Sequence, residues 1–110
     1  MSALIIAPFW GVFHGPLWLR PEFGYSGIPF GAFATSTVAL SVTMAYVVNK
    51  SGGSLFTVTV AHFLMNFGLA FVPALGIDAA RSFVIYAALN VVYAVIVVTV
   101  SGRRLGRIPA

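Results

Sequence analysis

The 110-residue sequence contains no cysteine and very little charge. Without cysteine, neither a disulfide framework nor a thiolate metal site can form. Only 7% of the residues are charged, whereas a soluble domain typically carries about 25%. The only two acids, Glu22 and Asp78, lie in separate turns beside proline or glycine. We interpret both as solvated turn residues, so the chain lacks a buried carboxylate pair of its own.

Apolar residues, in contrast, make up 60% of the chain, and the mean hydropathy is +1.01. A helix that crosses a bilayer needs roughly 20 apolar residues, so the chain has room for about four. Turn-forming residues separate four apolar segments, at about 3–18, 28–48, 55–72 and 82–100. Because backbone groups in lipid must bond within their own segment, each segment is expected to be helical. The prediction is an all-α, polytopic membrane bundle of about four transmembrane helices, with residues 1–110 as a single membrane domain.

The net charge of +4 comes largely from the C-terminal tail. In a four-span bundle these tail arginines and Lys50 fall on one face, and Arg20 and Arg81 fall on the other. An excess of Lys and Arg marks the cytoplasmic side, which predicts that both termini are cytoplasmic. A basic run directly after an apolar helix therefore indicates orientation in the bilayer rather than nucleic-acid binding. The tail arginines are Arg103, Arg104 and Arg107.

Small and polar residues inside the apolar segments predict how the helices pack. Small side chains recur at four-residue spacing in the second segment, which predicts that this helix lies between its neighbours in the bundle. Asn90 in the last segment has no partner in its own sequence neighbourhood and predicts a packing hydrogen bond. The small residues are Gly27, Gly31, Thr35, Ser41 and Ala45.

His62 and Asn66 lie four residues apart in the third segment, so they share one helix face, which Thr59 extends. Polar side chains at bilayer depth are costly and face protein or water. An interhelical hydrogen bond, worth about 0.6 kcal/mol in membranes, is the structural alternative. Two such groups exceed what packing needs, so we favour a functional site. The first and third segments run in the same direction, so His14 and His62 can meet.

His14 is followed by a glycine and Pro16 in the first segment. Proline lacks a backbone donor, which leaves the carbonyl of Val12 without its usual helical partner. A broken backbone at membrane depth is tolerated where it lines a cavity, which favours a water-accessible site beside His14. The alternative is an ordinary helix end, with Trp10 and Trp18 forming an interfacial belt.

Three stretches together resemble the CPBP family of intramembrane proteases, which includes the CAAX prenyl endopeptidases and bacterial proteins linked to bacteriocin processing or immunity. Trp10–His14 (WGVFH) is similar to the family motif F-x-x-x-H, with Trp in place of the first Phe. His62–Asn66 (HFLMN) is similar to the motif H-x-x-x-N, and the turn Asn49–Leu55 resembles the one that precedes it. The resemblance implies an integral protein of a bacterial or archaeal plasma membrane.

The first motif of that family, E-E-x-x-x-R, does not occur in this sequence. In the family it lies upstream, on an earlier helix, and supplies the glutamate thought to activate water. The resemblance therefore implies that the chain is the C-terminal part of a CPBP-like domain; a degenerate paralogue is the alternative. In either case we expect no peptide hydrolysis by the 110 residues alone.

The resemblance also assigns roles to the polar residues of the chain. His14 would orient the attacking water, and His62 and Asn66 would hold the oxyanion. Two histidines and an amide are a poor zinc set, but an added glutamate would improve it. A divalent metal such as zinc, with His14 and His62 as ligands, therefore remains open. The implied partner is a peptide or prenylated-protein substrate; the sequence does not identify it or the oligomeric state.

Two other classes of function fit parts of the pattern. In a b-type haem subunit, His14 and His62 would be axial ligands from facing helices, but Asn66 would have no role. In a non-catalytic membrane scaffold or channel component, the polar residues would serve helix association only.

Overall fold

The computed structural model describes residues 2–23 and 25–107. They form four α-helices, α1 (Ser2–His14), α2 (Phe30–Lys50), α3 (Leu55–Phe71) and α4 (Ala79–Ser101). Short 3-10 turns connect or extend them, and no strand occurs in the described ranges. The prediction of an all-helical fold is confirmed, and the helix bounds lie close to those of the four apolar segments.

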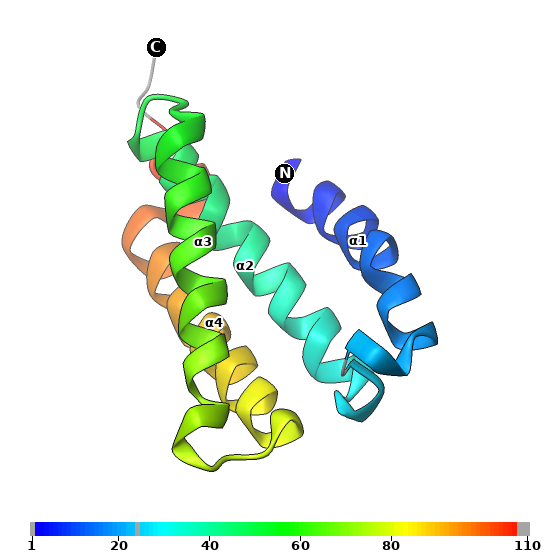
Figure 1. Cartoon of the computed structure of the whole chain (residues 1–110). Helices are drawn as coiled ribbons and strands as arrows, with labels where there is room; N and C mark the ends of the chain where they lie inside the picture. Colours follow the sequence, from blue (N-terminus) through cyan, green and yellow to red (C-terminus); the bar gives the residue numbers. More distant parts are fainter. Residues whose placement is uncertain (1, 24, 108–110) are drawn as a thin grey trace.

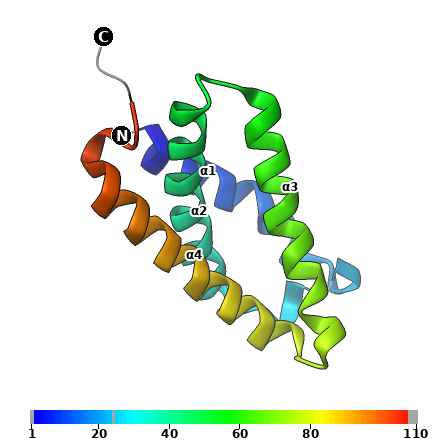
Figure 2. The same ribbon diagram turned by 90° about the vertical axis from the view of Figure 1, so that its left-hand side faces the viewer.

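Helix α2 occupies the centre of the bundle. It packs against α1, α3 and α4, and α4 crosses it obliquely over much of its length (Figures 1 and 2). Helices α1 and α3 run in the same direction, as the four-segment arrangement predicts. The start of α1, the end of α4 and the α2–α3 turn lie at one end of the molecule, which we call the terminal end (Figure 1). The structure contains no bilayer, so the side that faces the cytoplasm stays a prediction.

The buried face of α2 is rich in small hydroxyl residues. Two of them satisfy their hydroxyls within the helix: Thr37 Oγ1 donates to the Phe33 carbonyl, and Ser41 Oγ to the Thr37 carbonyl, each at 2.9 Å. Asn90 of α4 donates through Nδ2 to Ser36 Oγ at 3.0 Å, and both side chains are buried. The prediction of a packing hydrogen bond at Asn90 is therefore confirmed.

The prediction that α2 packs between its neighbours is confirmed, but only some of the small residues lie on its packed face. Gly27 lies in a 3-10 turn before α2 begins, and Gly31 and Thr35 are exposed. A Cβ added at Gly27 or Gly31 would meet no atom within 4 Å. The packed face carries the buried Ser41 of that set together with larger residues such as Phe33 and Leu40.

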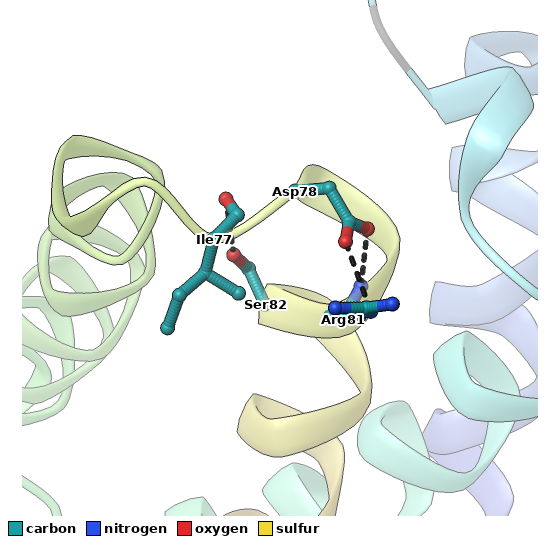
Figure 3. Close-up of polar contacts among 4 residues, drawn as sticks. All are labelled: Ile77, Asp78, Arg81 and Ser82. Atoms are coloured by element: carbon teal, nitrogen blue, oxygen red, sulfur yellow. Dashed lines mark hydrogen bonds and ion pairs between the residues drawn. The ribbon is translucent and has the colours of Figure 1, made fainter.

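Local signals explain where the last two helices begin. Gly52 and Gly53 adopt positive φ angles of 65° and 85°, which glycine tolerates without a Cβ penalty. Ser54 then caps α3 by accepting a bond from the backbone of Thr57. Asp78 caps α4 through the Arg81 backbone N–H at 2.9 Å and also pairs with the Arg81 side chain (Figure 3).

Two of the described helices, α2 and α4 with its C-terminal extension, are long and apolar enough to cross a membrane. The other two apolar helices are shorter, so four spans are not confirmed. The first predicted segment is not one continuous α-helix: α1 ends at His14 and a 3-10 turn, Gly15–Leu19, follows. Pro16 explains this break, because it removes a helical donor and clashes with the preceding turn.

Candidate functional site

A cavity of about 580 Å³ lies between the four helices, and His14, His62 and Asn66 all line it. His14 comes from the end of α1, and the other two from the middle of α3. The expectation that these three residues converge is therefore met by the geometry. Apolar side chains such as Phe33 and Leu40 of α2 form the floor.

A hydrogen bond to the backbone of α1 sets the tautomer of His14. Its Nδ1 lies 2.8 Å from the Trp10 carbonyl oxygen, one turn earlier. A carbonyl oxygen only accepts, so Nδ1 carries the proton and donates; in the neutral ring, Nε2 is then the acceptor. The ring packs against Phe33 at a centroid distance of 5.8 Å. His14 is thus a partly buried acceptor on the wall of the cavity.

Trp10 links the two histidines. Its indole centroid lies 6.2 Å from that of His14 and 5.0 Å from that of His62, with the His62 ring edge-on. Both imidazoles therefore lie against one aromatic ring. Trp18 also has contacts within the bundle: its Nε1 donates to the Ile28 carbonyl at 3.2 Å and its ring packs on Phe33. The interfacial belt of Trp10 and Trp18 stays a prediction.

Helix α3 presents its polar residues unequally. His62 is half-buried, and Asn66 lines the cavity while it remains exposed on the open side. Thr59 is exposed and is absent from the cavity wall. The expected polar stripe on α3 is therefore shorter than predicted, because only its second half faces α1 and α2.

The structure adds polar residues that sequence reasoning did not single out. Tyr25, from the turn before α2, and Tyr86, from α4, line the same cavity. Ser82 also lines it, and its hydroxyl donates to the Ile77 carbonyl at 3.3 Å (Figure 3). The sequence does contain a signal for Tyr86, because Tyr86 precedes Asn90 by one helical turn and therefore shares its inward face.

The acids of the chain lie away from the cavity. Glu22 pairs with Arg20 at 3.2 Å and Asp78 pairs with Arg81 at 3.2 Å, and all four side chains are largely exposed. In the described part of the chain, no three His, Cys, Asp or Glu residues come together. Catalytic zinc usually takes three such ligands. The two imidazoles and the amide therefore do not make a zinc site without a further ligand.

Comparison with known proteins gives one match. The model of a family described as type II CAAX prenyl endopeptidase Rce1-like matches residues 1–68. This range contains both histidines and Asn66. No curated protein and no solved structure matches the chain.

Proposed function

The chain belongs to the Rce1-like family of type II CAAX prenyl endopeptidases, and we propose that it forms the histidine–asparagine part of an intramembrane active site. The family is a family of membrane-embedded proteases, so the chain is an integral membrane protein of the peptidase class. The proposed reaction is hydrolysis of a peptide bond in a prenylated-protein or peptide substrate. The family match does not favour the haem-subunit and scaffold alternatives.

One observation carries the proposal: His14, His62 and Asn66 line a single cavity of about 580 Å³. They come from two different helices, and His14 precedes His62 by 48 residues in the sequence. Polar side chains at membrane depth are costly unless they face protein or water. A hollow of this size holds several waters and a segment of extended peptide. Three convergent hydrogen-bonding groups in such a hollow supply the water-orienting and oxyanion-binding part of what hydrolysis needs.

The proposed role of each site residue follows from whether its side chain donates or accepts a hydrogen bond. Nε2 of neutral His14 accepts a hydrogen bond and so orients the attacking water. The Asn66 amide and one N–H of the His62 ring donate, and both stabilise the oxyanion that forms when water attacks the scissile carbonyl carbon. The tetrahedral intermediate then collapses, the C–N bond breaks, and a proton passes to the leaving amine. Products are a carboxylate and an amine.

The proton from water needs an acceptor that the chain does not place in the cavity, since both acids form ion pairs elsewhere. We propose that a glutamate outside these 110 residues is the general base. If zinc participates, His14 and His62 are its candidate ligands and that carboxylate would complete the set. The steps above depend on the side chains alone.

The membrane topology completes the proposal. We propose that all four helices cross the bilayer, α1 together with its 3-10 extension, with the terminal end toward the cytoplasm because Lys50 and the C-terminal arginines lie there. With 17 residues, α3 is at the lower limit of a spanning helix. The cavity then lies within the membrane and below the cytoplasmic surface.

Two experiments test the function. The DNA upstream of Met1 is expected to encode an apolar segment with E-E-x-x-x-R. Protein that includes this segment should hydrolyse a prenylated CAAX peptide in vesicles, followed by mass spectrometry, whereas the 110-residue chain should not. His62→Ala should abolish turnover. Thr59→Ala is the matched control, because Thr59 lies one turn away on the same helix and outside the cavity.

Three results would overturn the proposal. Turnover by the isolated chain would show that no external carboxylate is needed. Wild-type activity in the His62→Ala variant would exclude the proposed oxyanion role. Absence of the upstream motif, together with inactivity of the complete protein, would indicate a non-catalytic member of the family.

A further inference from the structure

Trp10 of α1 lies where the candidate site meets a second hollow of the bundle. It is half-buried and lines the cavity that contains His14, His62 and Asn66. A second cavity, of about 450 Å³, lies at the terminal end between apolar residues of α1 and α2 and the tail arginines, and Trp10 lines it as well. Among the described residues, Trp10 alone lines both cavities. Its side chain therefore stands at the boundary between the two hollows.

The ring of His62 has few other contacts that could hold its orientation. In the described part of the chain this ring has no hydrogen-bond partner, and Trp10 is the one aromatic side chain that it contacts. The two ring centroids are 5.0 Å apart and the planes are inclined by 73°. Aromatic pairs prefer such edge-to-face arrangements at about 4.5–7 Å. The orientation of the His62 imidazole therefore depends on its packing against the indole.

This ring pair also connects two helices that otherwise have little contact. Both α1 and α3 pack more extensively on α2 than on each other. A side chain that reaches from α1 to His62 must be long, and it must be rigid if it is to hold a partner in place. Tryptophan meets both needs, because it offers a large ring system with only two side-chain torsions.

His14 is held in a different way. Its Nδ1 donates to the Trp10 carbonyl at 2.8 Å, and its ring also packs near Phe13 and Phe33, at centroid distances of 6.0 and 5.8 Å. The carbonyl at position 10 belongs to the backbone and is present with any side chain. A substitution of Trp10 should therefore disturb His62 while the hydrogen bond of His14 stays in place.

We propose that Trp10 is a positioning residue, whose indole holds the His62 ring so that one N–H points into the cavity. The catalytic consequence rests on the proposed function, in which His62 stabilises the oxyanion. Such a donor must lie about 3 Å from the oxyanion, and a displacement of about 1 Å can reduce the rate by about 10²-fold. Trp10 acts through His62 and takes no part in the chemical steps.

NMR spectroscopy of the 110-residue chain in detergent micelles tests the ring contact. The chain contains two histidines, so histidine-selective isotope labelling gives two ring spin systems. We expect nuclear Overhauser contacts between the Trp10 indole and the His62 ring, and a displacement of the His62 ring resonances by the indole ring current. Trp10→Leu should abolish this displacement, and Trp10→Phe should retain part of it. Phe9→Leu is the matched control, because Phe9 is the preceding residue and is 74% exposed.

Steady-state kinetics of the complete protein test the role of the contact. Trp10→Leu should lower kcat by about 10-fold to 10²-fold with KM nearly unchanged, because the orientation of an oxyanion donor matters mainly in the transition state. Trp10→Phe keeps an aromatic ring and should stay within about threefold of wild type. Phe9→Leu should match wild type. A residue that only filled space would tolerate leucine and phenylalanine equally.

Absence of nuclear Overhauser contacts between the two rings in the wild-type chain would overturn the inference. So would a wild-type kcat in Trp10→Leu, or equal losses in Trp10→Leu, Trp10→Phe and Phe9→Leu. If Trp10→Leu does not fold, the wild-type contacts and the smaller displacement in Trp10→Phe decide the question. Inactivity of the complete wild-type protein would refute the proposed function, whereas the NMR comparison would still show whether Trp10 orients His62, so the two failures are distinguishable.

Discussion

The hydrogen bond between Asn90 and Ser36 offers a quantitative test of how the bundle is held together. It joins α4 to α2 at 3.0 Å, and the two residues are only 2% and 3% exposed. Replacing either residue by alanine removes the bond. In the described structure every buried side-chain nitrogen and oxygen has a hydrogen-bond partner. Each replacement therefore acts on a site where all buried polar side-chain atoms are hydrogen-bonded.

The size of the effect follows from burial. Interhelical hydrogen bonds in membranes average about 0.6 kcal/mol and reach about 1.7. Because both groups are almost inaccessible, we expect about 1 kcal/mol of coupling. Asn90→Ala should lower the free energy of unfolding by about 2 kcal/mol, half of it from the void left behind. Ser36→Ala should cost about 1 kcal/mol, since it removes the acceptor to which Asn90 Nδ2 donates.

A double-mutant cycle measures the coupling. Unfolding by SDS in mixed micelles, followed by far-ultraviolet circular dichroism, gives the four free energies. The double variant should lose about 2 kcal/mol rather than the additive 3. Thr43→Ala is the control partner, because Thr43 is buried in α2 but its hydroxyl donates to Ala39 of the same helix. Additive losses for Asn90 and Ser36, equal to the control cycle, would refute the reasoning.

Three further predictions use the same chain. Asn66→Ala should lower kcat of the complete protease by about 10²–10³ with KM nearly unchanged, because an oxyanion donor acts mainly in the transition state; steady-state kinetics on the prenylated peptide measures both. Asp78→Ala should lower stability in SDS titration by about 1 kcal/mol through loss of the α4 cap; an unchanged midpoint would contradict the cap. Gly53→Ala should cost about 1–2 kcal/mol because its φ is +85°, whereas Gly68→Ala, in the interior of α3 with open space around it, should not destabilise; equal effects would show that the turn tolerates a side chain.

Sequence patterns predicted the helices well because their signals are local. The turn with Gly52 and Gly53 precedes α3 as predicted, whereas α4 begins at Ala79, after the Asp78 cap and three residues before the predicted start. The break after His14 was likewise readable from Pro16. The convergence of His14 with His62 needed one more step, the parallel direction of the first and third helices, and this follows from counting segments.

Packing faces were not predictable in the same way. The stripe through Gly31 and Thr35 suggested close approach, yet both residues are exposed, whereas Ser41 of the same set is buried. Small-residue spacing says which face permits close contact and not which face has a neighbour. Likewise, the tail arginines read as an orientation signal, because only tertiary structure brings them to the rim of a cavity next to Trp10.

The structure separates the part of the bundle that is tightly packed from the part that carries the proposed chemistry. Among the described residues, every buried one except Ala7 of α1 lies in α2 or α4, and no residue of α3 is buried. Two of the three proposed site residues nevertheless come from α3. Outward apolar side chains of α3, such as Phe63 at 61% and Leu64 at 58% exposure, then face lipid or a neighbouring protein segment. Substitutions at Asn90 therefore report on stability, and substitutions at Asn66, which is exposed, report on chemistry with little effect on folding.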